Sequence, residues 1–232
     1  MTVEELYSEF NLFYNNIASN QAPGLDNYEI SVYLTKAQET LVDALYSEFE
    51  HSENTRRKLA NLVKTKKLSA ITTTSANMLY PEYTTVYSEP SDCRNIVNEQ
   101  LRMAKNADKC IRGKVIDLQP VLHDEVDSIV ENPFRFNYKR GLRLDASYNN
   151  QKVIEILTKD KHIDYYQIRY IQNPLPIILT NSLNSNLPED TGMQINGVIF
   201  SYNNSSNGSL IPELHRQLIE YAAKMAYQDY KQ

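Results

Sequence analysis

The densest grouping of chemically active side chains in this sequence is the run from His123 to Asp127, which reads His-Asp-Glu-Val-Asp. An imidazole beside several carboxylates can bind a metal ion or exchange protons with a substrate. Acidic residues are equally favoured in the first turn of a helix, where the helix dipole is positive. We expect the run to open a short helix over residues 124–130, and an enzyme that uses His123 to Asp127 is the alternative.

A second group combines positive charge with aromatic rings between Pro133 and Leu144. Its basic members are Arg135, Lys139, Arg140 and Arg143, and its aromatic members are Phe134, Phe136 and Tyr138. Basic residues interleaved with aromatic ones can hold the phosphates and stack on the bases of a single-stranded nucleic acid. The net charge of the chain is −5, which argues against a general nucleic-acid binder. Contact with an acidic neighbour, or burial of the rings in the core, explains the pattern at least as well.

Common catalytic and cofactor motifs are absent from the sequence. It contains no GxGxxG, GxxxxGKS/T, GxSxG or HExxH pattern, and its six glycines leave few loops that could cradle a phosphate. Its two cysteines, Cys93 and Cys110, form no CxxC pair and are expected to be free thiols. His215 falls in the first turns of a predicted helix and is expected at the surface. We therefore predict no catalytic residue, no metal site and no cofactor, in a protein that is not an enzyme.

The composition is that of a folded protein. Among 232 residues, 41% are hydrophobic and 23% are charged, which suits one sizeable core or two small ones. The N-terminus lacks the apolar stretch of a signal peptide, and no apolar run approaches the ~18 residues that a membrane helix needs. We expect a soluble protein without a membrane partner. Residues 55–67 contain six basic residues and no acidic one, and are expected to form a solvated helix face.

Helical patterns begin at four places in the chain: Thr2, Asp26, Ser52 and Pro212. At the first two, a Glu three residues later gives the spacing of a capping box, in which each side chain accepts the backbone N–H of the other residue. Apolar residues at helical spacing follow, so two amphipathic helices are expected to form a hairpin. Proline suits the first turn of the C-terminal helix, because a helix leaves that N–H without a partner.

The middle of the chain is rich in β-forming residues. Strands are expected at 68–74, 80–87, 109–121, 141–145, 152–157, 163–171 and 193–202. The three strands between residues 141 and 171 are spaced as an antiparallel meander, with a turn at Asn149-Asn150. Residues 92–105 fit neither a helical nor a strand period. The order of elements predicts an α+β fold, in which an N-terminal helical hairpin and the C-terminal helix form a helical body beside an antiparallel β-rich middle region.

This order suggests three parts. We expect an N-terminal helical part over residues 1–66, a β-rich region over residues 67–211, and a C-terminal helix over residues 212–232 that packs on the N-terminal helices.

The stretch from Ile163 to Thr180 leads out of the predicted sheet. Its first half is rich in Ile and Tyr and is typical of a strand. Pro174 and Pro176 then interrupt the ladder, because proline has no N–H to donate. The apolar run Ile177-Ile178-Leu179 comes directly after them. A strand that continues beyond such a break must change its partner, to another sheet or to another chain.

Several stretches of the chain resemble structural neck proteins of crAss-like phages. They are residues 28–39 with 52–59, the strand motif Tyr166-x-Ile168-x-Tyr170-Ile171-x-x-Pro174-x-Pro176-Ile177-x-Leu179, and the run from Pro212 to Ala226. More distantly, the layout is similar to that of the tail adaptor proteins of short-tailed phages, also called tail tubular or gatekeeper proteins. Those proteins have a helical body and a β-rich extension, and they assemble as twelvefold rings under the portal.

The resemblance implies a virion structural protein that forms a portal-proximal head-to-tail connector ring. It implies a homo-oligomer of twelve copies, with the portal protein and other neck or tail ring proteins as partners, and transient passage of genomic DNA through the lumen. It also implies a place in the tail or neck of the virion after assembly in the host cytoplasm. A net negative lumen would let DNA slide, because few basic side chains would hold its phosphates.

The resemblance also suggests two sets of contact residues. A subunit or partner interface is expected at Tyr166, Arg169, Tyr170, Pro174, Pro176 and Ile177. The lumen, or contact with a neighbour, is expected at Arg135, Lys139, Arg140 and Arg143. The alternative function is a carbohydrate- or receptor-binding β module of a phage tail, which the β-rich, tyrosine-containing middle region favours.

Overall fold

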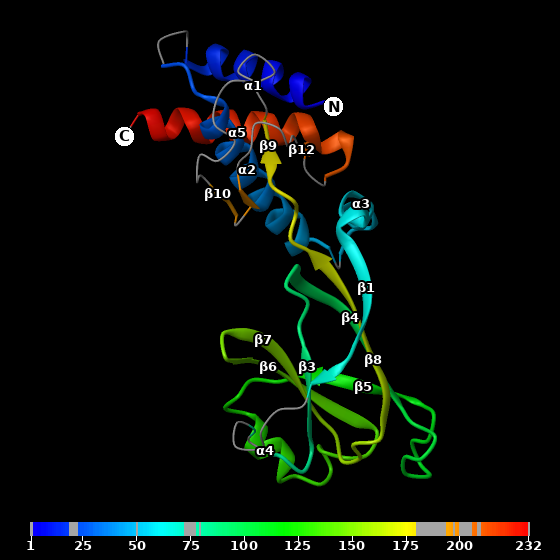
Figure 1. Cartoon of the computed structure of the whole chain (residues 1–232). Helices are drawn as coiled ribbons and strands as arrows, with labels where there is room; N and C mark the ends of the chain where they lie inside the picture. Colours follow the sequence, from blue (N-terminus) through cyan, green and yellow to red (C-terminus); the bar gives the residue numbers. More distant parts are fainter. Residues whose placement is uncertain are drawn as a thin grey trace. The chain divides into compact units, whose positions relative to one another are not determined.

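The chain folds as two compact units. The computed structural model describes residues 2–18, 23–49, 51–71, 78, 80–179, 194–196, 198–199, 206–207 and 210–231. Unit 1 comprises Met1–Leu62 and Asn173–Gln232, and unit 2 comprises Val63–Gln172. Helices at both ends of the chain and a mostly antiparallel sheet in its middle confirm the predicted α+β class (Figure 1). No helix in the described part of the chain is long and apolar enough to cross a membrane.

Unit 1 is built mainly from helices. They are α1 (Val3–Ala18), α2 (Asn27–Ser47), α3 (Glu53–Lys58) and α5 (His215–Tyr230), with the 3-10 turns η1 (Ala60–Leu62) and η3 (Pro212–Leu214). Helix α5 packs against both α1 and α2, so the end of the chain joins the N-terminal helices into one body (Figure 1). Apart from His215, its buried residues are small or aliphatic: Leu218, Ile219, Ala222, Ala223 and Ala226.

Both predicted capping boxes are confirmed. The Glu5 N–H donates to Thr2 Oγ1 at 3.2 Å, and the Thr2 N–H donates to Glu5 Oε2 at 2.8 Å. The corresponding distances between Asp26 and Glu29 are 2.7 and 2.9 Å. These two sequence signals therefore fix the starts of α1 and α2 by local chemistry alone.

The third helix is shorter than its sequence pattern suggests. Ser52 caps α3, but the helix ends at Lys58, and Val63 already begins a strand. The basic segment 55–67 is therefore half helix and half strand, and the prediction of a single solvated helix face is wrong. Its three later lysines, at 64, 66 and 67, lie exposed on the strand.

His215 is buried, contrary to the expectation of a surface position. It is the first residue of α5 and is only 4% exposed. Its Nε2–H donates to the carbonyl of Leu210 at 3.2 Å, while Nδ1 has no hydrogen-bond partner among the described residues. Removal from water lowers the pKa of this imidazole. A single histidine near a helix start carries no sequence signal of burial, because its side chain suits either environment.

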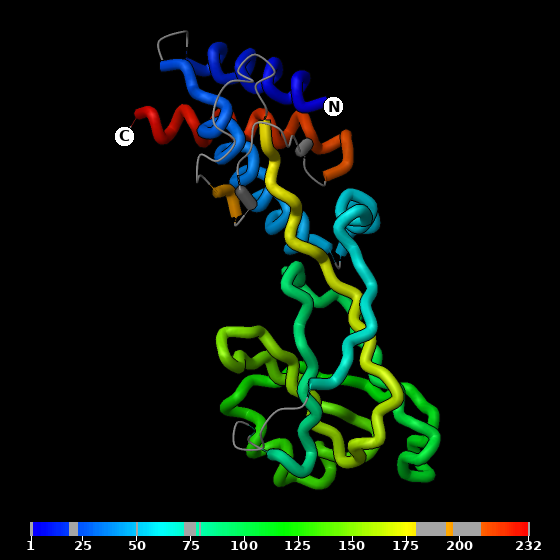
Figure 2. Tube along the Cα trace, viewed as in Figure 1, coloured from blue at the N-terminus to red at the C-terminus, as the bar shows by residue number. Residues whose placement is uncertain are grey.

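Three polar side chains on α2 hold the extended segment 175–179. The Ile177 N–H donates to Thr35 Oγ1 at 3.1 Å, and that hydroxyl lies 3.4 Å from the Ile177 carbonyl. The Leu179 N–H donates to Ser31 Oγ at 3.0 Å, and Gln38 Nε2 donates to the Leu175 carbonyl at 2.7 Å. We call this set of hydrogen bonds the backbone clamp. Figure 2 shows the path of the segment, in yellow, beside α2.

The clamp forms because the spacing of alternate residues in the extended segment matches the spacing of successive turns in α2. Two residues of an extended chain advance by about 6.6 Å, and four residues of a helix advance by about 6 Å. Alternate residues of the segment therefore meet successive turns of α2. Ser31, Thr35 and Gln38 are all buried, so the helix takes over hydrogen bonds that a neighbouring strand would otherwise provide.

Strand β9 (Ile177–Ile178) also pairs with β12 (Ser206–Asn207). The preceding strand, β8 (Ile163–Gln172), pairs instead with two strands of unit 2. The predicted change of partner across Pro174 and Pro176 is therefore confirmed. Residues 194–195 and 198–199, expected within one strand, form two short paired strands, β10 (Gln194–Ile195) and β11 (Val198–Ile199). The rest of the expected strand at 193–202 lies outside the described residues.

Unit 2 is a curled eight-stranded sheet. Its other strands are β1 (Val63–Leu68), β2 (Ala70–Ile71), β3 (Thr84–Ser88), β4 (Cys93–Met103), β5 (Val115–Pro120), β6 (Arg140–Tyr148) and β7 (Gln151–Leu157). The strand order is β1-β8-β4-β5-β6-β7-β3-β2, with β5 and β6 parallel. Only Ser69 separates β1 from β2, so the two ends of the sheet belong to one short stretch of chain. One stretch can serve both ends only because the sheet curls back on itself.

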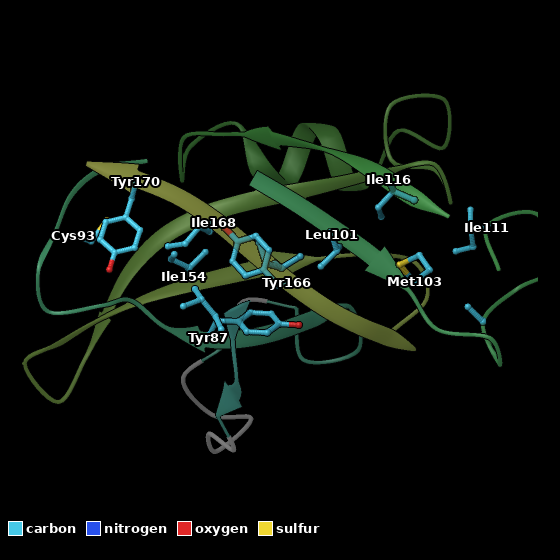
Figure 3. Close-up of a cluster of buried hydrophobic side chains, with 13 residues drawn as sticks. Tyr87, Cys93, Leu101, Met103, Ile111, Ile116, Ile154, Tyr166, Ile168 and Tyr170 are labelled. Carbon is cyan, nitrogen blue, oxygen red and sulfur yellow. The ribbon is translucent and has the colours of Figure 1, made fainter. Parts of the chain in front are cut away.

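The curled sheet encloses the core of unit 2. Figure 3 shows Tyr166 of β8 and Leu101 of β4 at the centre of this cluster, with Ile154 of β7 and Tyr87 of β3 around them. The rings of Tyr87 and Tyr166 lie 4.9 Å apart. Both cysteines are free, and Cys93 is buried in this core. A smaller cluster lies under the short helix α4 (Val126–Val130).

The predicted meander is correct only for its first two strands. β6 and β7 form an antiparallel pair, and Asn149 and Asn150 have φ values of 50° and 62°, as a two-residue hairpin turn requires. β8 does not join them, because β7 already has β6 on one edge and β3 on the other. It lies between β1 and β4 instead.

Two further strands differ from the prediction. Residues 92–105, which fitted no period, contain β4, the longest of the described strands, whose irregular register explains the broken alternation. The expected strand at 109–121 is formed only from Val115, because residues 104–114 make turns around the buried Ile111. Of the expected strand at 68–74, residues 72–74 lie outside the described part of the chain.

Replacing Thr35 with valine keeps the shape of the side chain but removes the hydroxyl of the backbone clamp. The buried Ile177 N–H then loses its partner, which costs about 1–3 kcal/mol. We expect Thr35→Val to lower the free energy of unfolding by that amount in urea denaturation followed by helical circular dichroism. Thr40→Val is the matched control, because Thr40 is an exposed residue of the same helix whose hydroxyl donates to the Lys36 carbonyl. Equal losses in the two variants would contradict the clamp.

The burial of His215 makes the stability of the chain sensitive to acid. Its pKa is lowered from 6.5 in the folded state, so the unfolded chain binds the proton more readily. Stability from this group is present above pH 6.5 and declines as the pH falls below that value. Melting temperatures measured between about pH 7.5 and about pH 5 should fall further for the native chain than for His215→Gln. His51→Gln, at an exposed histidine, should melt like the native chain at every pH.

Candidate functional site

The run from His123 to Asp127 does not converge on a reaction centre. His123 Nε2–H donates to the backbone carbonyl of Asp145 at 2.9 Å. Asp127 lies in the first turn of α4 and accepts a hydrogen bond of 2.5 Å from the Tyr80 hydroxyl. This bond to a carboxylate raises the pKa of Tyr80 to about 12. Within the described ranges, no three His, Cys, Asp or Glu residues are grouped so that they could hold a metal ion.

The basic and aromatic run divides into an ordered loop and a separate ion-pair network. The loop, residues 131–139, lies between α4 and β6. Phe136 is its buried anchor, and its ring packs edge-on against Tyr83 at 5.3 Å. Asn132 and Asn137 brace the backbone, because the carboxamide oxygens accept the N–H groups of Phe134 at 3.0 Å and Lys139 at 2.9 Å. These bonds fix the loop without any regular secondary structure.

The loop presents an aromatic ring to solvent. The side chain of Phe134 is 89% exposed, the largest exposure of any large hydrophobic residue in the described part of the chain. Arg135 and Lys139 are exposed on the same loop, and Arg140, the first residue of β6, is exposed directly after it. We call Phe134 and these three basic residues the loop knob. A ring held in water by a braced backbone is a typical anchor of a protein interface.

Arg143 does not belong to the loop knob. It lies on β6, and its side chain is 15% exposed. Its guanidinium lies 3.3 Å from Glu99 Oε1 and 3.4 Å from Asp145 Oδ1. Glu99 in turn accepts a hydrogen bond of 2.8 Å from Tyr166, and burial next to this carboxylate raises the pKa of the phenol. Arg143 therefore neutralises an acid at the edge of the core.

Most residues of the expected interface are buried within their own unit. Tyr166 and Tyr170 point into the core of unit 2, where the Tyr170 hydroxyl donates to Asp92 at 3.0 Å. Pro174, Pro176 and Ile177 are buried in unit 1. These side chains position the strand and its continuation, and they leave little surface for a partner.

Arg169 is the exposed member of the set. Its neighbours across the sheet are Thr65 on β1 and Asn98 on β4, which are also exposed. The three residues form a polar row on the outer face of the sheet.

Two partial signals of these sites are present in the sequence. The basic and aromatic composition of the loop was visible, but the exposure of Phe134 against the burial of Phe136 was not. The polar residues Ser31, Thr35 and Gln38 interrupt the face of an otherwise amphipathic helix at helical spacing, and that pattern could have indicated the backbone clamp.

Comparison with known proteins gives matches over the whole chain. The family model described as phage tail ring protein 3/4 matches residues 1–232. The chain is 30% identical over 241 residues to "Ring protein 4/5" of Bacteroides phage crAss001, covering 98% of this chain and 94% of that protein. It is 32% identical over 235 residues to "Ring protein 3" of the same phage, covering 97% and 95%.

Proposed function

This chain belongs to the phage tail ring protein 3/4 family, and on that premise we propose that it forms a head-to-tail connector ring in the virion. The ring joins the capsid portal to the tail, and genomic DNA passes through its lumen. We propose twelve copies, with the portal protein and other neck or tail ring proteins as partners. The subunits are made in the host cytoplasm and act in the neck or tail of the virion.

The loop knob is the observation that supports this function best. A ring closes through heterologous contacts, in which one surface of each subunit meets a different surface of the next. Such a contact needs a rigid anchor on one side. Phe134, held out by the braced loop and flanked by Arg135, Lys139 and Arg140, has this character.

The charge of the chain favours a neighbouring subunit as the partner of the loop knob. The chain has a net charge of −5, so outside this basic loop its acidic residues are in clear excess. A second copy therefore offers acidic surface to the three basic residues. We place the loop knob at the subunit contact and away from the DNA path, where basic residues would hold the phosphates.

The stretch from Ile163 to Thr180 has a different role in this proposal. Arg169, with the polar row on the outer face of the sheet, provides a second contact surface. Tyr166 and Tyr170 act through this surface, because they fix β8 from within the core. Pro174, Pro176 and Ile177 lie beyond β8, in unit 1, and hold the continuation of the strand. A carbohydrate-binding module is less well supported, because Tyr87, Tyr166 and Tyr170 are buried and cannot stack on a sugar.

Mass measurement tests the ring directly. A twelve-subunit ring of 26.8 kDa chains has a mass of about 320 kDa. We expect a species of this mass in mass photometry, either for the purified chain or after addition of portal protein and neighbouring ring proteins. A chain that stays monomeric in all of these mixtures would rule the proposal out.

The loop knob has its own test. Phe134→Ser removes an exposed anchor, so the melting temperature of the monomer should not change. Truncation of an interface anchor typically costs about 2 kcal/mol or more in each contact, so the ring should be lost at concentrations where the native chain assembles. Phe134→Leu keeps an apolar anchor and should retain the ring. A Phe134→Ser chain that assembles like the native one would remove the loop knob from the interface.

A further inference from the structure

A groove opens in unit 2 beside strand β1. Its volume is about 640 Å³, and it lies between β1, the end of β3 and the turn of the β6–β7 hairpin. The residues that matter for its chemistry are Lys66, Lys67 and Lys152, with Glu89 and Pro90 at the end of β3. Neither the loop knob nor the polar row of Arg169 lines it.

The groove exists because the ladder between the two ends of the sheet stops early. β2 pairs with β3 through Ala70 with Tyr87 and Ile71 with Val86. The same register would continue with Leu68 opposite Glu89 and Lys67 opposite Pro90. It cannot continue, because the Glu89 N–H already donates to the carbonyl of Lys152 at 3.2 Å, and Pro90 has no N–H.

The outer edge of β1 is therefore left without a strand partner. β1 pairs with β8 along one edge, from Val63 with Ile171 to Leu68 with Tyr166, and the described residues place no strand on its other edge. Such an edge carries unused backbone N–H and carbonyl groups and can accept another strand.

Positive charge surrounds this edge. Alternate residues of a strand lie on one face, so Lys64 and Lys66 share a face; Lys64 already pairs with Asp92 at 3.2 Å, and Lys66 is exposed. Lys67, on the other face, lies 4.4 Å from the ring of Tyr165. Lys152 approaches from the hairpin, and Glu89 is the only acidic residue in the described lining of the groove. An added strand with acidic residues at alternate positions would bring carboxylates opposite the lysines.

We propose that this groove binds an extended, acidic segment of a partner protein, which adds as a strand along the free edge of β1. Backbone hydrogen bonds supply the pairing, and Lys66 and Lys152 select for acidic side chains. A peptide is favoured over a nucleic acid as the ligand. The free N–H and carbonyl groups of a strand edge pair with those of another peptide backbone, and a sugar-phosphate backbone cannot complete such a ladder. The site does not depend on the ring, so it is measurable on the monomer.

The probe is a fluorescent peptide of alternating Glu and Val residues, and its binding to the purified chain is measured by anisotropy. We expect Lys66→Glu combined with Lys152→Glu to weaken binding about tenfold, because each substitution removes an attractive charge pair and adds a repulsion. Both lysines are exposed, so the variant should keep the melting temperature of the native chain. Lys105→Glu, at an exposed lysine of the same unit outside the groove, should bind like the native chain.

A second probe tests the backbone pairing. The same peptide methylated on alternate backbone nitrogens cannot complete a ladder and should bind at least about tenfold more weakly. Bound native peptide should also slow hydrogen exchange of the β1 amides. Equal binding of the two peptides, competition by an oligothymidylate at the same charge concentration, or no loss in the double lysine variant would each overturn the proposal. Ring assembly is read separately by mass, so the two proposals can fail independently.

Discussion

The backbone clamp is the interaction on which the organisation of this chain depends. The chain leaves the sheet of unit 2 after Gln172 and enters unit 1 as an extended segment with two prolines. Buried N–H and carbonyl groups must find partners, and a segment that has left its sheet has lost the usual ones. Ser31, Thr35 and Gln38 provide them from a helix, with distances between 2.7 and 3.4 Å. Hydroxyl and carboxamide groups inside a helical core would otherwise be costly, and here they allow an extended segment to be buried beside α2.

In the core of unit 2, the hydroxyl groups of tyrosines likewise have hydrogen-bond partners. Tyr166 and Tyr170 lie four residues apart on β8, with their rings in the core and their hydroxyls at its edge. Each hydroxyl donates to a carboxylate, Glu99 or Asp92, and each carboxylate also has a cation, Arg143 or Lys64. An apolar ring with a polar tip can therefore fill the core while its hydroxyl remains hydrogen-bonded. This explains why a chain with 17 tyrosines and no tryptophan can build its core partly from phenols.

Features that depend on residues close together in the sequence were predictable, whereas the neighbours of each strand in the sheet were not. The capping boxes of α1 and α2, the Asn149-Asn150 turn and the break at Pro174 and Pro176 each depend on residues within a few positions of one another. The position of β8 between β1 and β4 depends on which edges other strands have already occupied, which no local pattern records. The loop of residues 131–139 shows the same division. Its composition was visible, but the burial of Phe136 depends on contacts such as that with Tyr83, which lies far away in sequence.

The shared stretch of β1 and β2 sets the order in which the chain can fold. Among the described strands, β1 pairs with β8 alone, and β8 is the last strand of unit 2 to leave the ribosome. Contacts of such large sequence separation form slowly, because a long loop must close before they are gained. Unit 1 can be completed only later, because α1 and α2 pack on α5, which follows β8 in the chain. During synthesis the sheet can therefore close first, while the amphipathic N-terminal helices remain without their partner until α5 has been made.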